Sequence, residues 1–258
     1  VFLLQMISLF LLLLCVHLIA DFYLQRHSWI MDKVAHHERS IGLFKHMLTH
    51  VLLTGGALLS VYILLKQTHD IVLLWPWFIA WAVIITTHYL IDIWKTYQSF
   101  VLKYYLIDQL SHIVILLLIS LWLSSMVPDV TASLSGYQLY LLWLCSFIFL
   151  ANPMAVTIMV LLMPYRQAIQ DADSDLPDQV SQPSKEGQRM GIIERILVLA
   201  CIGNQAYMIP VLLLMGKLYY RLQQPDAKDS ALYRRYVLIG SSVSFISALL
   251  LGLLLNIA

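Results

Sequence analysis

Seven long apolar segments constrain this chain more than any other feature of its sequence. A helix that spans a bilayer needs about 20 mostly apolar residues, and this chain of 258 residues is 60% hydrophobic and only 12% charged. The segments cover residues 1–24, 42–65, 71–94, 102–126, 137–163, 192–216 and 235–257. The sequence therefore predicts an all-α fold, a polytopic integral membrane helical bundle with about six to seven transmembrane segments.

Composition divides this predicted bundle into parts. All nine histidines lie before residue 113, and we interpret residues 1–127 as a four-helix membrane domain that carries them. Residues 137–163 are expected to form a fifth span. The polar stretch 164–190 is rich in Asp, Gln, Ser and Pro, which predicts a flexible linker. Residues 191–258 then hold the C-terminal membrane segments.

The distribution of Lys and Arg predicts the orientation of the bundle. With the N-terminus outside, the first, third and fifth connections face the cytoplasm and carry most of the basic residues. The basic residues between Lys217 and Arg235 break this bias if segment 192–216 crosses the membrane once. Because Gly203, Asn204 and Pro210 interrupt that segment, we favour a re-entrant hairpin over residues 191–217 and a span over 235–257; a single crossing is the alternative.

Each of the first four segments carries one polar pair at a spacing of four residues. The pairs are His17/Asp21, His46/His50, His88/Asp92 and Asp108/His112. Residues at this spacing share one face of a helix. The pairs lie alternately at the end and at the start of successive segments, so helices of alternating direction bring all four to one membrane face. The positive-inside bias predicts that this face is cytoplasmic.

Because polar residues are unfavourable inside a membrane, we expect these eight residues to have binding partners there. Insertion scales assign about 2.5–3.5 kcal/mol to an Asp at the centre of a span. Five imidazoles and three carboxylates without a thiolate are typical ligands of zinc, manganese or iron, and the three cysteines stand singly in apolar runs. We predict one or two divalent ions held by all eight residues; a metal-free network of hydrogen bonds between helices is the alternative.

Three residues are candidates for a catalytic role beside the metal. Asp21 or Asp108 can act as a general base if it is not engaged by the ion. Lys95 follows Asp92 by three residues and can lie over a phosphate group, although a lysine that extends to the interface is an equal interpretation. Gln109 can orient a ligand or substrate. His36, His37 and Glu38 are expected in a solvated loop.

Several stretches resemble a family of bacterial membrane proteins, the domain-of-unknown-function family 3307. The strings are HLIADFYLQ (17–25), HMLTH (46–50), HYLIDIWK (88–95) and LIDQLSH (106–112), and the later GIIERILVL (191–199) and YVLIGSSVS (236–244) resemble the second half of longer members. The resemblance implies the bacterial inner membrane but no activity. A looser similarity to inner-membrane metal-dependent hydrolases implies hydrolysis by analogy.

The function expected first is a membrane-embedded metal-dependent hydrolase acting on a lipid phosphate or ester at the cytoplasmic face. Its partners would be membrane lipids, and the net charge of +1 offers no basic field for nucleic acid. The alternatives are a di-iron lipid oxidase and a non-enzymatic membrane regulator whose His/Asp layer only sets helix packing. A transporter is disfavoured because polarity is confined to one side of the membrane.

Overall fold

The structure is a computed structural model that describes residues 2–257, except 69–72, 128, 173–184 and 223–230. The described residues form helices and no strand, which confirms the all-α fold class. Among them, six helical stretches are long and apolar enough to cross a membrane, in agreement with the six to seven segments predicted. They are Ile7–Leu24, Ile41–Gln67, Trp75–Thr96, Leu102–Met126, Gln138–Ile169 and Ala231–Ile257.

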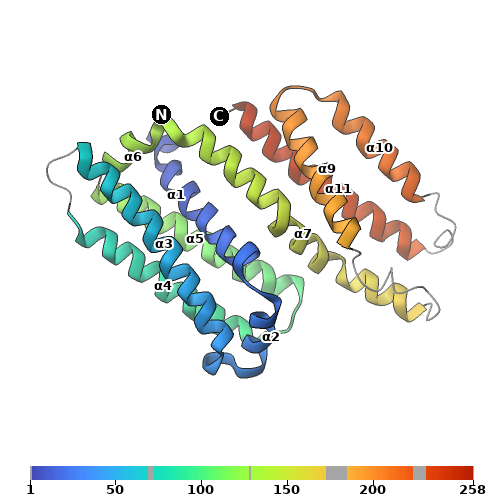
Figure 1. The fold of residues 1–258 in the computed structure, drawn as a ribbon. Coiled ribbons are helices and arrows are strands. Elements are labelled where there is room, and N and C mark those ends of the chain that lie inside the picture. The colour runs from blue at the N-terminus through green and yellow to red at the C-terminus, as the bar shows by residue number, and fades with distance from the viewer. Residues whose placement is uncertain (1, 69–72, 128, 173–184, 223–230, 258) are drawn as a thin grey trace. The chain divides into compact units, whose positions relative to one another are not determined.

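The chain divides into two compact units, and the first ends at Ile148. Its elements are α1 (Phe2–Ile19), the π-helical turn η1 (Ala20–Leu24), α2 (His27–His36), the 3-10 turn η2 (His37–Arg39), α3 (Ile41–Thr68), α4 (Trp75–Thr96), α5 (Leu102–Met126), α6 (Asp129–Leu134), η3 (Ser135–Tyr137) and the start of α7 (Gln138–Ala172). Four helices close a ring, because α1 and α4 each contact both α3 and α5 (Figure 1).

One half of this ring, taken along the helix axes, is filled by apolar side chains from all four helices. They come from the middle of α1, the first half of α4, the second half of α3 and α5, and from α6: Leu9, Leu13, Leu58, Val61, Leu65, Trp77, Ala80, Ile84, Leu116, Leu123, Val130 and Leu134. Since lipid chains are as apolar as these side chains, close van der Waals packing holds this half together. The other half of the ring is where the polar pairs lie.

Short hydrogen bonds fix the corner between α2 and α3. The Ser40 hydroxyl accepts a bond from the Leu43 amide at 2.9 Å, which caps the start of α3. The same hydroxyl and the Gly42 amide donate to Asp32 Oδ2 at 2.6 and 2.7 Å. These bonds, the one from Ser40 first, hold the pKa of the Asp32 carboxyl below its usual value. The corner thus folds α2 back against the start of α3.

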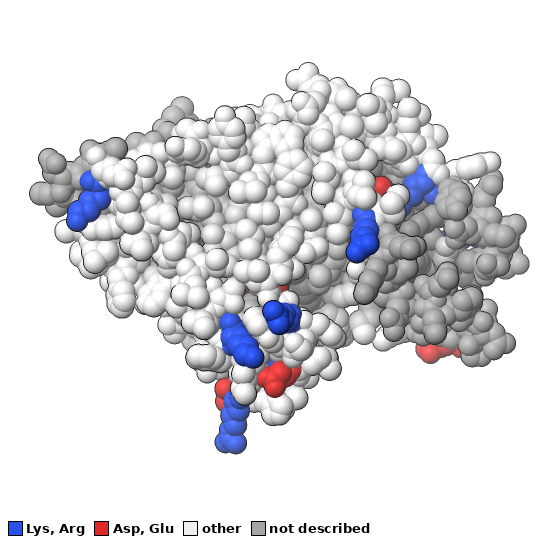
Figure 2. All heavy atoms as spheres, in the orientation of Figure 1, with Lys and Arg blue, Asp and Glu red and all other residues white. Residues whose placement is uncertain are grey.

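Charged side chains on the first unit gather near this corner. On the face drawn in Figure 2, Lys, Arg, Asp and Glu side chains cluster at the end of the bundle where α2 lies. Beside them the visible surface of the four-helix ring is broadly uncharged, as expected of helices that face lipid.

The second unit, Phe149–Ala258, contains the rest of α7 together with α9 (Lys185–Gly203), α10 (Met208–Leu222) and α11 (Ala231–Ile257). Within it α9, α10 and α11 all contact one another. The predicted segment 192–216 is two helices joined by a turn, with Gln205 at a φ of 64°. Its re-entrant course in the membrane stays a prediction. Of the predicted linker, residues 164–172 lie in α7 and 185–190 in α9, and 173–184 lie outside the described residues.

A buried arginine ties the helices of the second unit together. The Arg195 guanidinium in α9 donates to the Leu150 carbonyl at 2.6 Å, to the Ala151 carbonyl at 3.2 Å and to the Ser244 hydroxyl at 3.4 Å. Pro153 lies inside α7 and has no N–H to donate, which disturbs the helix next to those carbonyls. Arg195 therefore connects α9 to both α7 and α11.

We expect Gly42→Ala to weaken the corner between α2 and α3. An added Cβ would lie 2.6 Å from the Trp29 carbonyl oxygen and 2.7 Å from its Cα, so the backbone of α2 must move. Such overpacking costs about 1–3 kcal/mol, measurable as a lower unfolding temperature in detergent.

Gly56→Ala is the matched control in the same helix, because nothing lies within 4 Å of its added Cβ. Alanine favours the helix by about 0.8–1.0 kcal/mol over glycine, so this variant should be as stable as the parent or more so. Equal unfolding temperatures for the two variants would contradict the close contact at Gly42.

Candidate metal centre

The four ring helices bring all eight predicted metal ligands together. The pairs lie at the end of α1 with the following turn η1, near the start of α3, near the end of α4 and near the start of α5. Seven of the residues are buried and Asp21 is partly buried. The structure thus places them in one layer, in the half of the ring opposite the apolar core. They form three overlapping groups, and in each group one ligand atom per residue lies within 4.8 Å of the others.

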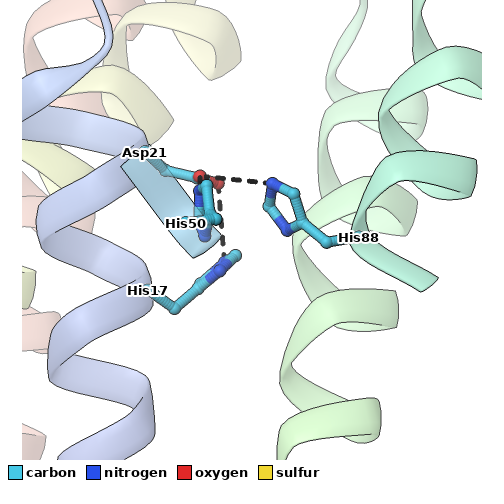
Figure 3. A group of neighbouring side chains, drawn as sticks. All are labelled: His17, Asp21, His50 and His88. Atoms are coloured by element: carbon cyan, nitrogen blue, oxygen red, sulfur yellow. Dashed lines mark hydrogen bonds and ion pairs between the residues drawn. The ribbon is translucent and has the colours of Figure 1, made fainter. Parts of the chain in front are cut away.

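The first group surrounds Asp21, which lies in the π-helical turn η1 (Figure 3). Its Oδ1 atom lies 2.8 Å from His50 Nε2 and 3.8 Å from His88 Nε2. Its Oδ2 atom lies 3.5 Å from His17 Nε2. Side chains from α1, α3 and α4 therefore turn toward one carboxylate. π-helical turns are rare and frequently lie at functional sites.

The second group joins α3 to α4. The Nε2 atoms of His46 and His88 are 3.2 Å apart, and Asp92 places Oδ2 3.4 Å from the first and Oδ1 3.8 Å from the second. Two nitrogens that bind one tetrahedral zinc ion at about 2.0–2.1 Å lie about 3.3 Å apart. The imidazole pair already has the spacing of two ligands of one ion.

The third group joins α4 to α5. His112 Nε2 lies 3.4 Å from Asp108 Oδ1 and 3.8 Å from Asp92 Oδ1. Because Asp92 belongs to this group and to the second, and His88 to the first and second, the three groups form one continuous cluster.

Several buried ligand atoms of the cluster form no hydrogen bond and make only longer ion-pair contacts. Among the described residues these are His17 Nε2, 3.5 Å from Asp21 Oδ2, and His112 Nε2, 3.4 Å from Asp108 Oδ1, which also forms no hydrogen bond. Buried polar atoms normally have a partner, and an imidazole nitrogen or carboxylate oxygen that lacks one can bind a metal. The nitrogen and oxygen ligands match zinc, manganese or iron. The residues present can therefore hold a divalent ion.

Sequence reasoning missed one member of the cluster, Lys33. This lysine lies in α2, in what was interpreted as a connection, yet its side chain is only 9% exposed and its Nζ donates to Asp92 Oδ2 at 2.6 Å. The two residues are 59 positions apart, so no helical spacing links them. Lys33 neutralises and orients Asp92, which is shared by two of the groups.

The other predicted residues fall into two sets. Lys95 lies at the edge of the cluster, with Nζ 4.0 Å from Asp108 Oδ2, and Gln109 donates to the same oxygen at 3.2 Å. His37 lies apart from the cluster: its Nδ1 is 2.9 Å from the Thr96 hydroxyl, and its ring stacks on Tyr97 at 4.1 Å.

The rest of the predicted solvated loop is exposed, but Glu38 and Tyr97 fix it to the end of α4. The Tyr97 hydroxyl donates to Glu38 at 2.7 Å. This bond is the main cause that lowers the pKa of the Glu38 carboxyl and raises that of the Tyr97 phenol. His36 is bonded to Asp32 at 2.9 Å, away from the cluster.

Comparison with known proteins finds one family. Residues 9–141, just over half of the chain, match a family described as "Protein of unknown function (DUF3307)". The match covers all eight clustered residues and both lysines beside them. No curated protein and no solved structure matches the chain.

We expect the purified protein to hold one or two divalent ions per chain, measured by elemental analysis. Replacing His88 and Asp92 together by Ala should remove most of the metal, because each belongs to two of the three groups. His27→Ala should keep it, since that histidine is exposed and outside the cluster. A metal-free parent, or a double variant that retains the full metal content, would contradict the assignment.

Proposed function

The chain belongs to the DUF3307 family, whose description names no activity, and we propose that it is a membrane-embedded metal-dependent hydrolase acting on a lipid-like phosphate or ester. The observation that carries the proposal is the buried layer in which imidazole and carboxylate groups from four helices converge, with several ligand atoms that form no hydrogen bond. Clusters of this kind between the helices of a bundle are a recurrent way to hold catalytic metals.

The residues of the cluster would have different roles in such a site. The group around Asp21 and the groups that share Asp92 would hold the ion or ions, with His46 and His88 between them. A divalent ion there would supply Lewis acidity and would lower the pKa of water. Asp108 would be the general base, because its Oδ1 is buried, forms no hydrogen bond among the described residues and lies 3.4 Å from His112 Nε2. Asp21 lies within 4.0 Å of four histidines and would serve as a ligand.

The edge of the cluster at α4 and α5 is the side from which a substrate enters. The side chains of Lys95 and Asp108 are 20% and 12% exposed, whereas that of His46 is 1% exposed. Trp94 and Tyr97 are exposed beside this edge at the end of α4, as aromatic residues at a membrane–water interface are. This supports a substrate that lies at the membrane surface.

We assign that surface to the cytoplasmic face of a bacterial inner membrane. At this end of the four ring helices, the connections and helix ends carry Arg26, Lys33 and Arg39, then Lys95 and Lys103, whereas the opposite end of the same four helices, in the residues that the structure describes, carries Lys66. The excess of basic residues supports this orientation by the positive-inside rule.

The composition and position of the cluster favour hydrolysis over its rivals. Di-iron bundles use a Glu from each of two helices and a Glu-x-x-His motif from each of two others, whereas this cluster has five histidines and three Asp. A transporter needs polar groups near the midplane. The half of the ring beyond the cluster is instead packed with large apolar side chains such as Leu65, Trp77 and Leu123.

We expect metal-dependent hydrolysis in detergent or nanodiscs. Chelator-treated protein reloaded with zinc, manganese or iron should cleave at least one member of a panel of lipid phosphates and lipid esters, detected by mass spectrometry. Asp108→Asn should lower the rate by about 10²–10⁴-fold, the usual contribution of a general base.

Asp171→Asn, at an exposed carboxylate in α7, is the matched control and should keep the parent rate. Metal-loaded protein that cleaves nothing in the panel, or Asp108→Asn with the parent rate, would contradict the proposal. Oxygen consumption with iron and a lipid would instead indicate the oxidase.

A further inference from the structure

Building on the proposed hydrolase, we propose that the group it cleaves is a phosphate monoester, which binds at the α4–α5 edge of the cluster with Lys95 as its anion-binding residue. A carboxylate ester or an acetal would need no such cation. The proposal depends on three observations: the buried atoms at this edge that form no hydrogen bond, the difference in hydrogen bonding between Lys33 and Lys95, and the net charge of the cluster.

Buried donor and acceptor atoms without hydrogen bonds gather at this edge. Lys95 Nζ, Asp108 Oδ1 and His112 Nε2 are all buried and form no hydrogen bond within the described part of the chain, and the last two form an ion pair at 3.4 Å. Asp108 Oδ2 is held by the Gln109 amide at 3.2 Å and is 4.0 Å from Lys95 Nζ, too far for a hydrogen bond. The edge therefore offers a donor on one side and ion-binding atoms on the other.

The two lysines of the cluster differ in whether their ammonium groups donate a hydrogen bond. Lys33 donates to Asp92 at 2.6 Å, and both side chains are at most 10% exposed, so this ammonium is committed to the protein. Lys95 contacts the Tyr105 ring at 5.8 Å but donates to no described acceptor. An ammonium with free N–H donors beside a metal group is the arrangement that binds a phosphate oxygen.

Net charge separates a phosphate from a neutral ester. Three carboxylates and two ammonium groups leave the cluster with one negative charge when the histidines are neutral. One divalent ion makes the total +1, and two make it +3. Buried excess charge is costly unless it is paired. A phosphate monoester carries about −1.5 to −2 at pH 7, so it offsets the total of +1 with one ion and at least half of the total of +3 with two ions, whereas a neutral ester offsets neither.

The reaction balances without an oxidant or a reductant. The oxygen of water forms a new P–O bond while the P–O bond to the alcohol breaks. One proton of the water passes to the Asp108 carboxylate and then to the leaving alkoxide. The products are an alcohol and inorganic phosphate, and Lys95 holds a phosphoryl oxygen throughout. Lipid phosphates and soluble phosphate monoesters share this chemistry, so the test includes both.

The test measures the binding of inorganic phosphate to the full chain loaded with zinc or manganese, by calorimetry in nanodiscs. Lys95→Met should weaken binding by about 10- to 100-fold, as expected for the loss of one charge-assisted hydrogen bond, while the metal content stays at the parent level. Lys95→Arg should restore part of the affinity. Lys103→Met, which removes a lysine from the first turn of α5, should leave binding unchanged.

The outcomes separate this inference from the proposed hydrolase. Release of phosphate from a lipid phosphate in vesicles, but not from a short soluble monoester, would assign the lipid source; the reverse would assign the soluble source. Metal-loaded protein that cleaves a neutral ester and does not bind phosphate would overturn the inference and keep the hydrolase. Equal phosphate affinity in the parent and in Lys95→Met would also overturn it, and protein without metal would overturn both.

Discussion

The first unit depends on one constraint: polar side chains at one depth of the membrane lose their contact with water and need partners within the protein. An isolated Asp inside a span costs about 2.5–3.5 kcal/mol on insertion scales, and this layer holds three of them. Each carboxylate accordingly lies within 4.0 Å of at least one histidine or lysine nitrogen. The ring of α1, α3, α4 and α5 brings the histidines and carboxylates together, and α2 adds Lys33.

The short helix α2, which lies outside the ring, supplies one more partner to the polar layer. The Asp32 carboxylate gathers the Ser40 hydroxyl and the Gly42 amide, and the close contact of Gly42 with Trp29 sets α2 against α3. From that position Lys33 reaches Asp92 in α4. The polar corner on the surface therefore positions the lysine that pairs with a carboxylate inside the cluster.

The sequence was sufficient for the parts of the site that lie within single helices. Spacings of four residues and alternating helix direction place every predicted ligand in the layer, because both follow from helix geometry. The division into groups was not predictable, since the contact of His46 with His88 depends on which helices are neighbours. Lys33 was missed because it reaches the cluster from a connecting helix. Hydropathy alone gives one segment over residues 192–216, but Gly203 and Asn204 predicted an interruption there, and a turn does separate α9 from α10.

X-ray absorption at the edge of the bound metal tests the central claim most directly, because it reports the ligands themselves. Protein in nanodiscs, loaded with zinc, should show nitrogen and oxygen ligands at about 2.0–2.2 Å, with the outer-shell scattering of several imidazole rings. The pattern should be lost when His88 and Asp92 are both replaced. A shell of sulfur at about 2.3 Å, or of oxygen without imidazole, would contradict a metal centre built from the His/Asp layer.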